Sequence, residues 1–158
     1  MTTAHIKTPL GTALIEGNES GISSLSWVEE ADLPTTQEIP EELKDCVTQL
    51  QFYFKGDLEE FKLPLNPKGT DFQEQVWQAL SEIPYGETIS YLQLAKNIEN
   101  AKAVRAVASA NGKNPLPILI PCHRVIGSDG SLTGYSGGLW RKKWLLKHEG
   151  ALKQTSLF

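Results

Sequence analysis

Alternating apolar and polar positions mark the first 30 residues, whereas most of the remaining chain follows helical spacing. Two alternating runs, 12–15 and 22–28, flank the turn-forming segment 17–21, and this arrangement predicts a β-hairpin. Within 41–55 the apolar residues stand three or four apart, at Leu43, Val47, Leu50 and Phe54. That spacing predicts an amphipathic helix, which Gly56 ends.

The segment 63–69 is rich in proline and glycine and is the predicted domain boundary, so that residues 1–67 form one domain and residues 68–158 another. A capping box of Thr70 and Gln73 predicts a helix that ends at Pro84. Three further helices are predicted at 90–98, at 101–111 with Gly112 just after its end, and around 140–148 with Gly150 as its stop.

The helices at 90–98 and 101–111 resemble a helix-turn-helix. The outer face of the second helix carries small residues around one arginine, and its members are Lys102, Arg105, Ala106 and Ser109. Such a face permits close approach to a duplex but offers few side chains to read bases, which favours a DNA probe over a sequence-reading regulator. An ordinary packed helical hairpin is the alternative.

Charge divides unevenly between the halves of this 158-residue chain, whose net charge is −4. Residues 1–67 hold 4 Lys/Arg and 12 Asp/Glu, whereas residues 68–158 hold 11 and 7. The second half is therefore the candidate for binding DNA. The apolar run 116–120 is far shorter than the roughly 20 residues of a membrane span, and no export signal precedes it, so we expect a cytoplasmic protein.

Two cysteines are present, and they differ in their surroundings. Cys46 falls in a helical pattern and is interpreted as a structural core residue. A disulfide between Cys46 and Cys122 is not expected without export. The three histidines show no metal-ligand spacing with the cysteines, so no metal site is predicted.

Cys122 lies in the segment Ile120-Pro-Cys-His-Arg-Val125, at the end of an apolar run that predicts a pocket mouth or floor. The neighbours His123 and Arg124 favour the reactive thiolate, and Glu149 is placed to orient His123. Taken alone, this pairing leaves a structural cysteine and a nucleophile equally open.

Four motifs at consistent spacing carry a family resemblance: 86–91 (GETISY), 103–107 (AVRAV), 114–125 (NPLPILIPCHRV) and 134–138 (GYSGG). Together they resemble the methylated-DNA–protein-cysteine methyltransferases, or 6-O-alkylguanine-DNA alkyltransferases. The resemblance implies an α/β fold with an N-terminal ribonuclease-H-like α/β domain. It also implies a mostly helical C-terminal domain that carries a helix-turn-helix.

The resemblance also implies roles for individual residues. Cys122 accepts the alkyl group, and His123 deprotonates it through a water, with Glu149 as the acidic partner. Asn114 shapes the turn near the cysteine, and Tyr91 helps rotate the target phosphate and donates toward the departing guanine.

Further residues are expected around the substrate. Arg105 fills the space that the extruded base leaves in the duplex, which is bound through its minor groove. The other expected DNA-binding residues are Tyr91, Lys102, Ser109 and Arg124. The expected pocket residues are Pro117, Val125, Tyr135 and Ser136.

The implied reaction is irreversible, stoichiometric transfer from the 6-oxygen of guanine, and from the 4-oxygen of thymine as an additional substrate, by a monomer without a cofactor. One alternative is a lesion-binding or regulatory DNA-binding module that transfers nothing. Another is a cysteine hydrolase, which adjacent Cys and His side chains fit poorly. Some relatives hold zinc in the N-terminal domain, but His5 and Cys46 do not complete a ligand set here.

The tail 154–158 resembles the short bacterial peptide that docks on the replication sliding clamp. The residues that carry this resemblance are Gln154, Ser156, Leu157 and Phe158. A frayed terminus is the alternative.

Overall fold

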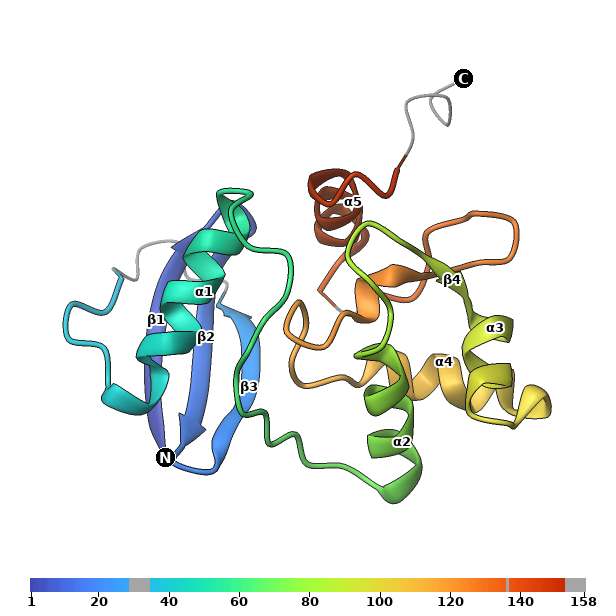
Figure 1. Ribbon diagram of the computed structural model, residues 1–158, viewed down its shortest axis with the longest axis horizontal. Coiled ribbons are helices and arrows are strands. Elements are labelled where there is room, and N and C mark those ends of the chain that lie inside the picture. Colours follow the sequence, from blue (N-terminus) through green and yellow to red (C-terminus); the bar gives the residue numbers. More distant parts are fainter. Residues whose placement is uncertain (29–34, 136, 153–158) are drawn as a thin grey trace. The chain divides into compact units, whose positions relative to one another are not determined.

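The computed structural model describes residues 1–28, 35–135 and 137–152. The chain divides into two compact units, Met1–Lys68 and Gly69–Phe158, each with its own core (Figure 1). The pocket residue Ser136 and the clamp residues Gln154, Ser156, Leu157 and Phe158 lie outside the described residues. No helix in the described ranges has the length and apolar character needed to cross a membrane.

The first unit is built on an antiparallel sheet of three strands, β1 (Thr2–Thr8), β2 (Gly11–Asn18) and β3 (Gly21–Val28), in that order. The hairpin predicted at 12–28 is therefore confirmed, and a bulge between Glu16 and Gly17 shifts its register. Ile22 of β3 also exchanges backbone hydrogen bonds with the connector between the two units, residues 63–69, donating to Pro64 O and accepting from Asn66 N. The connector is thus fixed to the edge of the sheet.

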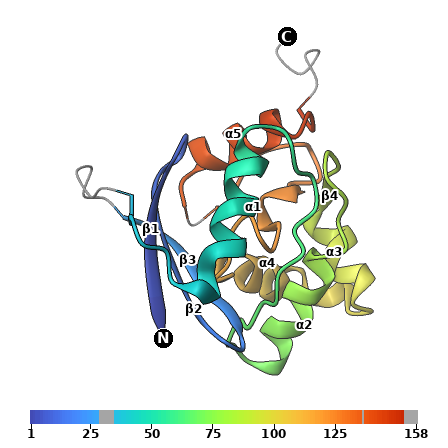
Figure 2. The ribbon, with the colours of Figure 1, turned by 60° about the vertical axis from the view of Figure 1, so that its left-hand side comes forward.

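One helix covers one face of this sheet. The chain forms a 3-10 turn at Glu41–Leu43 and continues as α1 (Lys44–Phe54), which Figure 2 shows lying against one face of the sheet. The alternating buried residues of the strands meet the apolar face of α1 in a core without a buried charge among the described residues. The buried helix residues are Leu43, Cys46, Val47, Leu50 and Tyr53.

The second unit begins with α2 (Asp71–Leu80), which opens with the predicted capping box. Thr70 Oγ1 accepts from Gln73 N, and Gln73 Oε1 accepts from Thr70 N, at 3.1 and 2.9 Å. The helix is three residues shorter than predicted because residues 81–83 tighten into turns with i→i+3 hydrogen bonds before Pro84. Trp77 Nε1 donates to Ala110 O at 2.9 Å inside the core, which anchors α2 to α4.

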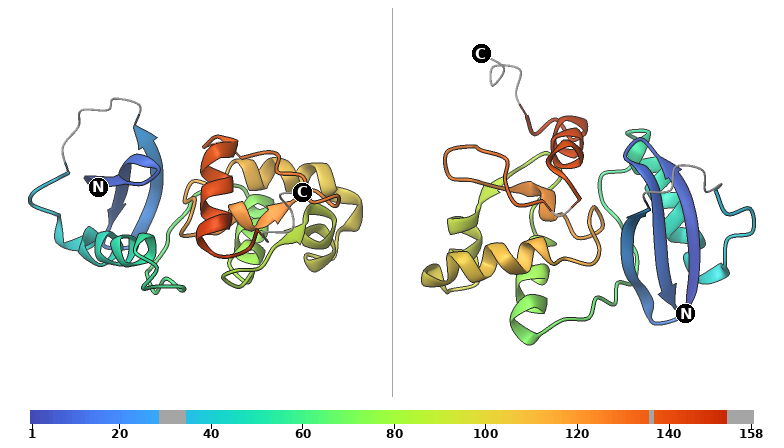
Figure 3. Two further views of the ribbon diagram at one scale, coloured as in Figure 1. Left: turned by 90° about the horizontal axis from the view of Figure 1, so that it is seen from above. Right: turned by 180° about the vertical axis from the view of Figure 1, so that it is seen from behind.

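Two adjoining helices follow, α3 (Tyr91–Asn97) and α4 (Val104–Gly112), with the 3-10 turn Ala101–Ala103 before α4. Figure 3 shows this pair lying away from α5 within the second unit. Glu99, with a φ of 59°, lies in the turn between the two helices. The predicted stop at Gly112 is wrong, because Gly112 is the last helical residue and Lys113 is the cap.

A short parallel pairing joins the start of α3 to the cysteine segment. Strand β4 (Ile89–Ser90) pairs with β5 (Val125–Ile126), so that Tyr91 begins α3 close to the segment that follows Cys122–Arg124. The last helix, α5 (Leu139–His148), then packs against that segment.

Gly150 ends α5 as predicted, in a Schellman motif. Its φ is 74°, its own N–H donates to Lys147 O at 3.0 Å, and Ala151 N donates to Leu146 O at 2.8 Å. The motif fixes Glu149 as the C-cap residue, and the Glu149 side chain is buried.

Candidate active site

Cys122 stands at the end of a tight, strained turn. Asn114 holds the turn from within, since its Oδ1 accepts from Leu116 N and its Nδ2 donates to Ile120 O, at 3.0 and 2.8 Å. Ile118 has a φ of 74°, which is costly for a β-branched residue. Pro121, at φ −79° and ψ 65°, is the centre of an inverse γ-turn in which Cys122 N donates to Ile120 O.

The thiol of Cys122 is buried, with the residue 5% exposed. Burial raises the pKa of Cys122 to about 11, against opposing effects of Asn114 and the Lys142 cation. The expectation that the neighbours His123 and Arg124 favour the Cys122 thiolate is therefore wrong for the protein without bound DNA. Desolvation outweighs the cations because Arg124 is paired elsewhere.

His123 and Glu149 form a fully buried pair. His123 Nε2 lies 2.9 Å from Glu149 Oε2, so the neutral ring donates its Nε2–H to the carboxylate. Burial lowers the pKa of His123, against the hydrogen bond and charge of Glu149. Burial alone would raise the pKa of Glu149, but the hydrogen bonds from His123 and Arg124 hold it well below its ordinary value.

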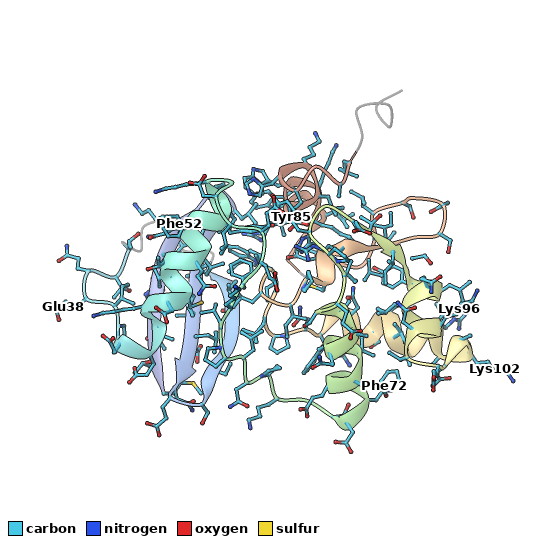
Figure 4. The ribbon with its side chains drawn as sticks, viewed as in Figure 1. Glu38, Phe52, Phe72, Tyr85, Lys96 and Lys102 are labelled. Atoms are coloured by element: carbon cyan, nitrogen blue, oxygen red, sulfur yellow. The ribbon has the colours of Figure 1, made fainter. Side chains whose placement is uncertain are left out.

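Arg124 does not face solvent, which corrects its expected place among the DNA-binding residues. Its Nε donates to Glu149 Oε1 at 2.8 Å and its Nη2 to Glu149 Oε2 at 3.0 Å, while Nη1 donates to Ile83 O at 2.7 Å. The Tyr85 ring lies 5.7 Å from the guanidinium, and Tyr85 (Figure 4) also donates to His148 O. Arg124 therefore positions Glu149.

Tyr91 is half-buried, and its hydroxyl donates to Thr133 O at 2.9 Å. Gly134 follows with a φ of 69°, and a Cβ there would lie 3.1 Å from the Tyr91 hydroxyl. Glycine is thus required for this close approach. Burial raises the pKa of Tyr91, so its hydroxyl stays protonated at neutral pH.

Lys142 is a buried residue near Cys122 that the sequence reasoning did not single out. It lies in a run of basic residues on α5 and yet is 0% exposed. Its Nζ donates to Val125 O at 2.6 Å and to Thr133 O at 2.7 Å, so Thr133 O accepts from both Lys142 and Tyr91. Burial lowers the pKa of Lys142 to about 8, against the effect of Cys122. Its helical spacing with Leu145 and Leu146 was the signal that indicated an inward-facing position.

Three buried polar atoms around Cys122 have no hydrogen-bond partner in the described structure: His123 Nδ1, Tyr135 Oη and Asn111 Oδ1. His123 follows Cys122 directly, and Asn111 Nδ2 donates to Cys122 O at 3.4 Å. Burial raises the pKa of Tyr135 well above its ordinary value, and the nearby Cys122 adds to the rise. Asn111 is a site residue that the sequence reasoning missed, because it was read only as the end of a helix.

The other expected residues fall into two groups. Lys102, Arg105 and Ser109 are exposed along the start and outer side of α4, and Figure 4 shows Lys102 projecting there. Val125 is buried and Pro117 half-buried near the cysteine turn. Among the described residues, no group of three His, Cys, Asp or Glu side chains is placed to hold a metal ion.

Comparison with known families gives a match to each part of the chain. The family described as "6-O-methylguanine DNA methyltransferase, ribonuclease-like domain" matches residues 1–67. The family described as "6-O-methylguanine DNA methyltransferase, DNA binding domain" matches residues 71–151.

Relatives named methylated-DNA–protein-cysteine methyltransferase match over nearly the whole chain. The protein of Methanosarcina acetivorans is 46% identical over 94% of this chain and 97% of its own length. That of Mycobacterium tuberculosis is 46% identical over 91% of this chain and 89% of its own length.

Solved structures agree. The O6-methylguanine methyltransferase of M. tuberculosis superposes with a TM-score of 0.82 at 43% identity, covering 98% of this chain and 96% of its own. The same organism's OGT in complex with DNA gives 0.83 at 44% identity, covering 93% and 91%. The mixed α/β fold expected from the sequence is therefore confirmed.

Proposed function

The chain belongs to the 6-O-methylguanine DNA methyltransferase family, and we propose that it repairs DNA by moving an alkyl group from the 6-oxygen of guanine onto Cys122. The 4-oxygen of thymine, which presents the same kind of alkyl ether, is a second substrate. The names of the relatives, methylated-DNA–protein-cysteine methyltransferases, and the DNA complex of the M. tuberculosis protein support DNA repair by alkyl transfer. The choice of Cys122 rests on the site itself.

One observation carries that choice: three buried polar atoms without a hydrogen-bond partner gather around Cys122. A buried donor or acceptor without a partner costs about 1–3 kcal/mol, so such atoms mark places where a ligand or a proton is handled. Cys46 offers no such surroundings, because it lies among apolar residues of the first unit and burial raises its pKa to about 12. Cys122 is thus the residue equipped for chemistry.

His123 supplies the proton acceptor that a buried thiol needs. With a pKa of about 11, only about one Cys122 thiol in ten thousand is ionised at pH 7. The Nδ1 lone pair of His123 is free to take the thiol proton through a water, while Nε2–H stays bonded to Glu149. Glu149 then stabilises the imidazolium that forms.

The bond changes balance without a further reactant. The sulfur electron pair forms a bond to the alkyl carbon, the carbon–oxygen bond breaks, and guanine leaves with the bonding pair. Tyr91, which stays protonated at neutral pH, donates its hydroxyl proton to the departing base, and the proton that His123 took from the thiol returns through solvent to the Tyr91 oxygen. The product is a thioether, which neither water nor thiols readily cleave, so each molecule reacts once.

A base stacked in a duplex does not reach a buried thiol, so the target nucleotide is everted, at a cost of a few kcal/mol. Helices α3 and α4 act as the helix-turn-helix that enters the minor groove. Arg105 is exposed on α4 and fills the space left by the base, with Lys102 and Ser109 beside it. The basic second half binds the DNA, and the acidic first half is the accessory domain. The protein works as a monomer in the cytoplasm, where thiols stay reduced.

Intact-mass analysis after mixing with a duplex that contains 6-O-methylguanine tests the proposal. We expect one added methyl group per molecule, none in Cys122→Ala, and full transfer in the matched control Cys46→Ala. DNA binding without any mass gain would instead indicate a lesion-binding module. A gain that persists in Cys122→Ala would move the acceptor elsewhere.

The role of Arg105 has its own test. We expect Arg105→Ala to slow transfer from duplex DNA strongly but transfer from free 6-O-benzylguanine hardly at all. Equal slowing on the two substrates would show that Arg105 supports the fold or the thiol and not base eversion.

The tail motif gives a further proposal, which rests on the sequence alone: residues 154–158 dock on the replication sliding clamp. Deletion of these residues should abolish clamp binding in a pull-down while alkyl transfer stays at its original rate. Unchanged clamp affinity after the deletion would leave the tail as a plain terminus.

A further inference from the structure

Asn111 is a buried polar residue that the reaction described above does not use. It is 1% exposed at the C-terminal end of α4, and its Nδ2 donates to Cys122 O at 3.4 Å. Its Oδ1 is buried and has no hydrogen-bond partner in the described structure. Exchanging the amide oxygen and nitrogen would bring two oxygens to 3.4 Å, so the orientation with Nδ2 toward the carbonyl is favoured.

The position of Asn111 matters because it reaches both sides of the reaction. Besides Cys122 O, its side chain lies near enough to the Tyr91 hydroxyl to lower the pKa of Tyr91, against the rise that burial causes. A base attacked at its 6-oxygen substituent by Cys122 and protonated by Tyr91 must lie between these two residues. The Asn111 amide therefore lies beside that base.

Because Asn111 Oδ1 is a buried acceptor without a partner, it favours a base that presents an N–H donor to it. Oxygen acceptors left unpaired in a buried site penalise a ligand that brings no hydrogen to them, and sites built to pair with an N–H reject analogues without it. Of the groups that distinguish 6-O-alkylguanine from other 6-O-alkylpurines, the exocyclic 2-amino group is the N–H donor.

We propose that Asn111 is a specificity-determining residue whose Oδ1 accepts a hydrogen bond from the 2-amino group of the everted guanine, while its Nδ2 fixes the Cys122 carbonyl. This inference rests on the proposed function. It adds a contact that ties the base to the same helix that carries Arg105.

A comparison of two substrates tests the proposal. Transfer rates to Cys122 are measured by intact mass for duplexes that contain 6-O-methylguanine or 6-O-methylhypoxanthine, which lacks the amino group. The wild-type protein should react about tenfold faster with the guanine substrate. Asn111→Leu, of similar volume, should reduce that ratio to near one, and Asn97→Leu on the exposed side of α3 should leave it unchanged.

The comparison of substrates distinguishes a failure of the Asn111 role from a failure of the proposed alkyl transfer. The ratio compares two substrates on one variant, so a general loss of stability in Asn111→Leu cancels; Asn111→Asp keeps the acceptor oxygen and should keep the preference. A ratio in Asn111→Leu equal to that of the wild type would overturn the role of Asn111. No methyl gain by the wild-type protein from either substrate would instead overturn the proposed function.

Discussion

His123 Nε2 lies 2.9 Å from Glu149 Oε2, and neither side chain is exposed to solvent. The carboxylate fixes the ring tautomer, so that the other nitrogen, Nδ1, presents a lone pair toward the interior. A histidine held in this way is a base across the whole neutral range, because burial lowers its pKa below the ordinary 6.5.

This pairing predicts the pH dependence of alkyl transfer. Between pH 6.5 and 7.5 the wild-type rate should be nearly flat, because the neutral thiol, the neutral imidazole and the Lys142 cation are the starting forms throughout. In His123→Gln the rate should be lower and should rise about tenfold per pH unit, since transfer then depends on the thiolate of a group with a pKa of about 11. Single-turnover rates on a methylated duplex measure this, and parallel profiles for the two proteins would exclude His123 as the base.

Glu149 should be the most costly charged side chain to replace. Glu149→Gln removes the anion that faces His123 and Arg124, and breaking a buried pair in this way costs about 3–5 kcal/mol in the free energy of unfolding. Urea denaturation measures the loss, with Glu82→Gln at an exposed position of the same unit as the control.

The lowered pKa of Glu149 also predicts how the free energy of unfolding changes at acidic pH. Because the pKa of Glu149 is lower in the folded state than its ordinary 4.5, its contribution is full above that value and disappears as the pH falls. The difference in unfolding free energy between wild type and Glu149→Gln should therefore shrink below about pH 4.5. A difference that is constant down to pH 3 would contradict the depressed pKa.

Lys142 gives the same sign of pH dependence, but in an alkaline range. Its pKa of about 8 in the folded state lies below the ordinary 10.5, so the unfolded chain binds more protons between these values and folding gains stability as the pH rises. Relative to Lys142→Met, the wild-type protein should gain up to about 1.4 kcal/mol per pH unit in that window. The exposed neighbour Lys143 provides the control, because Lys143→Met should show no such slope.

Glycine should be required at position 150 because of the positive φ there, and not because a side chain would clash. A Cβ at Gly150 meets nothing within 4 Å, but its φ of 74° costs an L-residue about 1–2 kcal/mol. Gly150→Ala should therefore lower the unfolding free energy by about that amount and leave alkyl transfer by the folded protein intact. Gly56→Ala, with a φ of 84° and equally open surroundings, should lose a similar amount in the first unit.

Local sequence patterns predicted most helices and the hairpin, because each carries its own signal: alternation at 12–28, the capping box at Thr70, and glycine after α5. Boundaries were less predictable. Gly112 stays helical because the chain turns only after Lys113, and the last turn of α2 tightens where a continuous helix was expected.

The site was only partly predictable. His123 and Glu149 were expected to pair, and the structure brings them into contact. Arg124 and Lys142 reversed the usual expectation for basic residues, because the acceptors that allow their burial, Glu149 and the carbonyls of Val125 and Thr133, come from distant segments. No local pattern shows such partners, nor the orphaned oxygen of Asn111.

Helix α4 has one further consequence. Arg105 and Asn111 are six residues apart on a single helix, which separates their backbones by about 9 Å along its axis. The buried hydrogen bond from Trp77 to Ala110 O holds the inner end of that helix in place. In the proposed complex, a duplex bound at Arg105 would therefore lie at a fixed distance from Cys122.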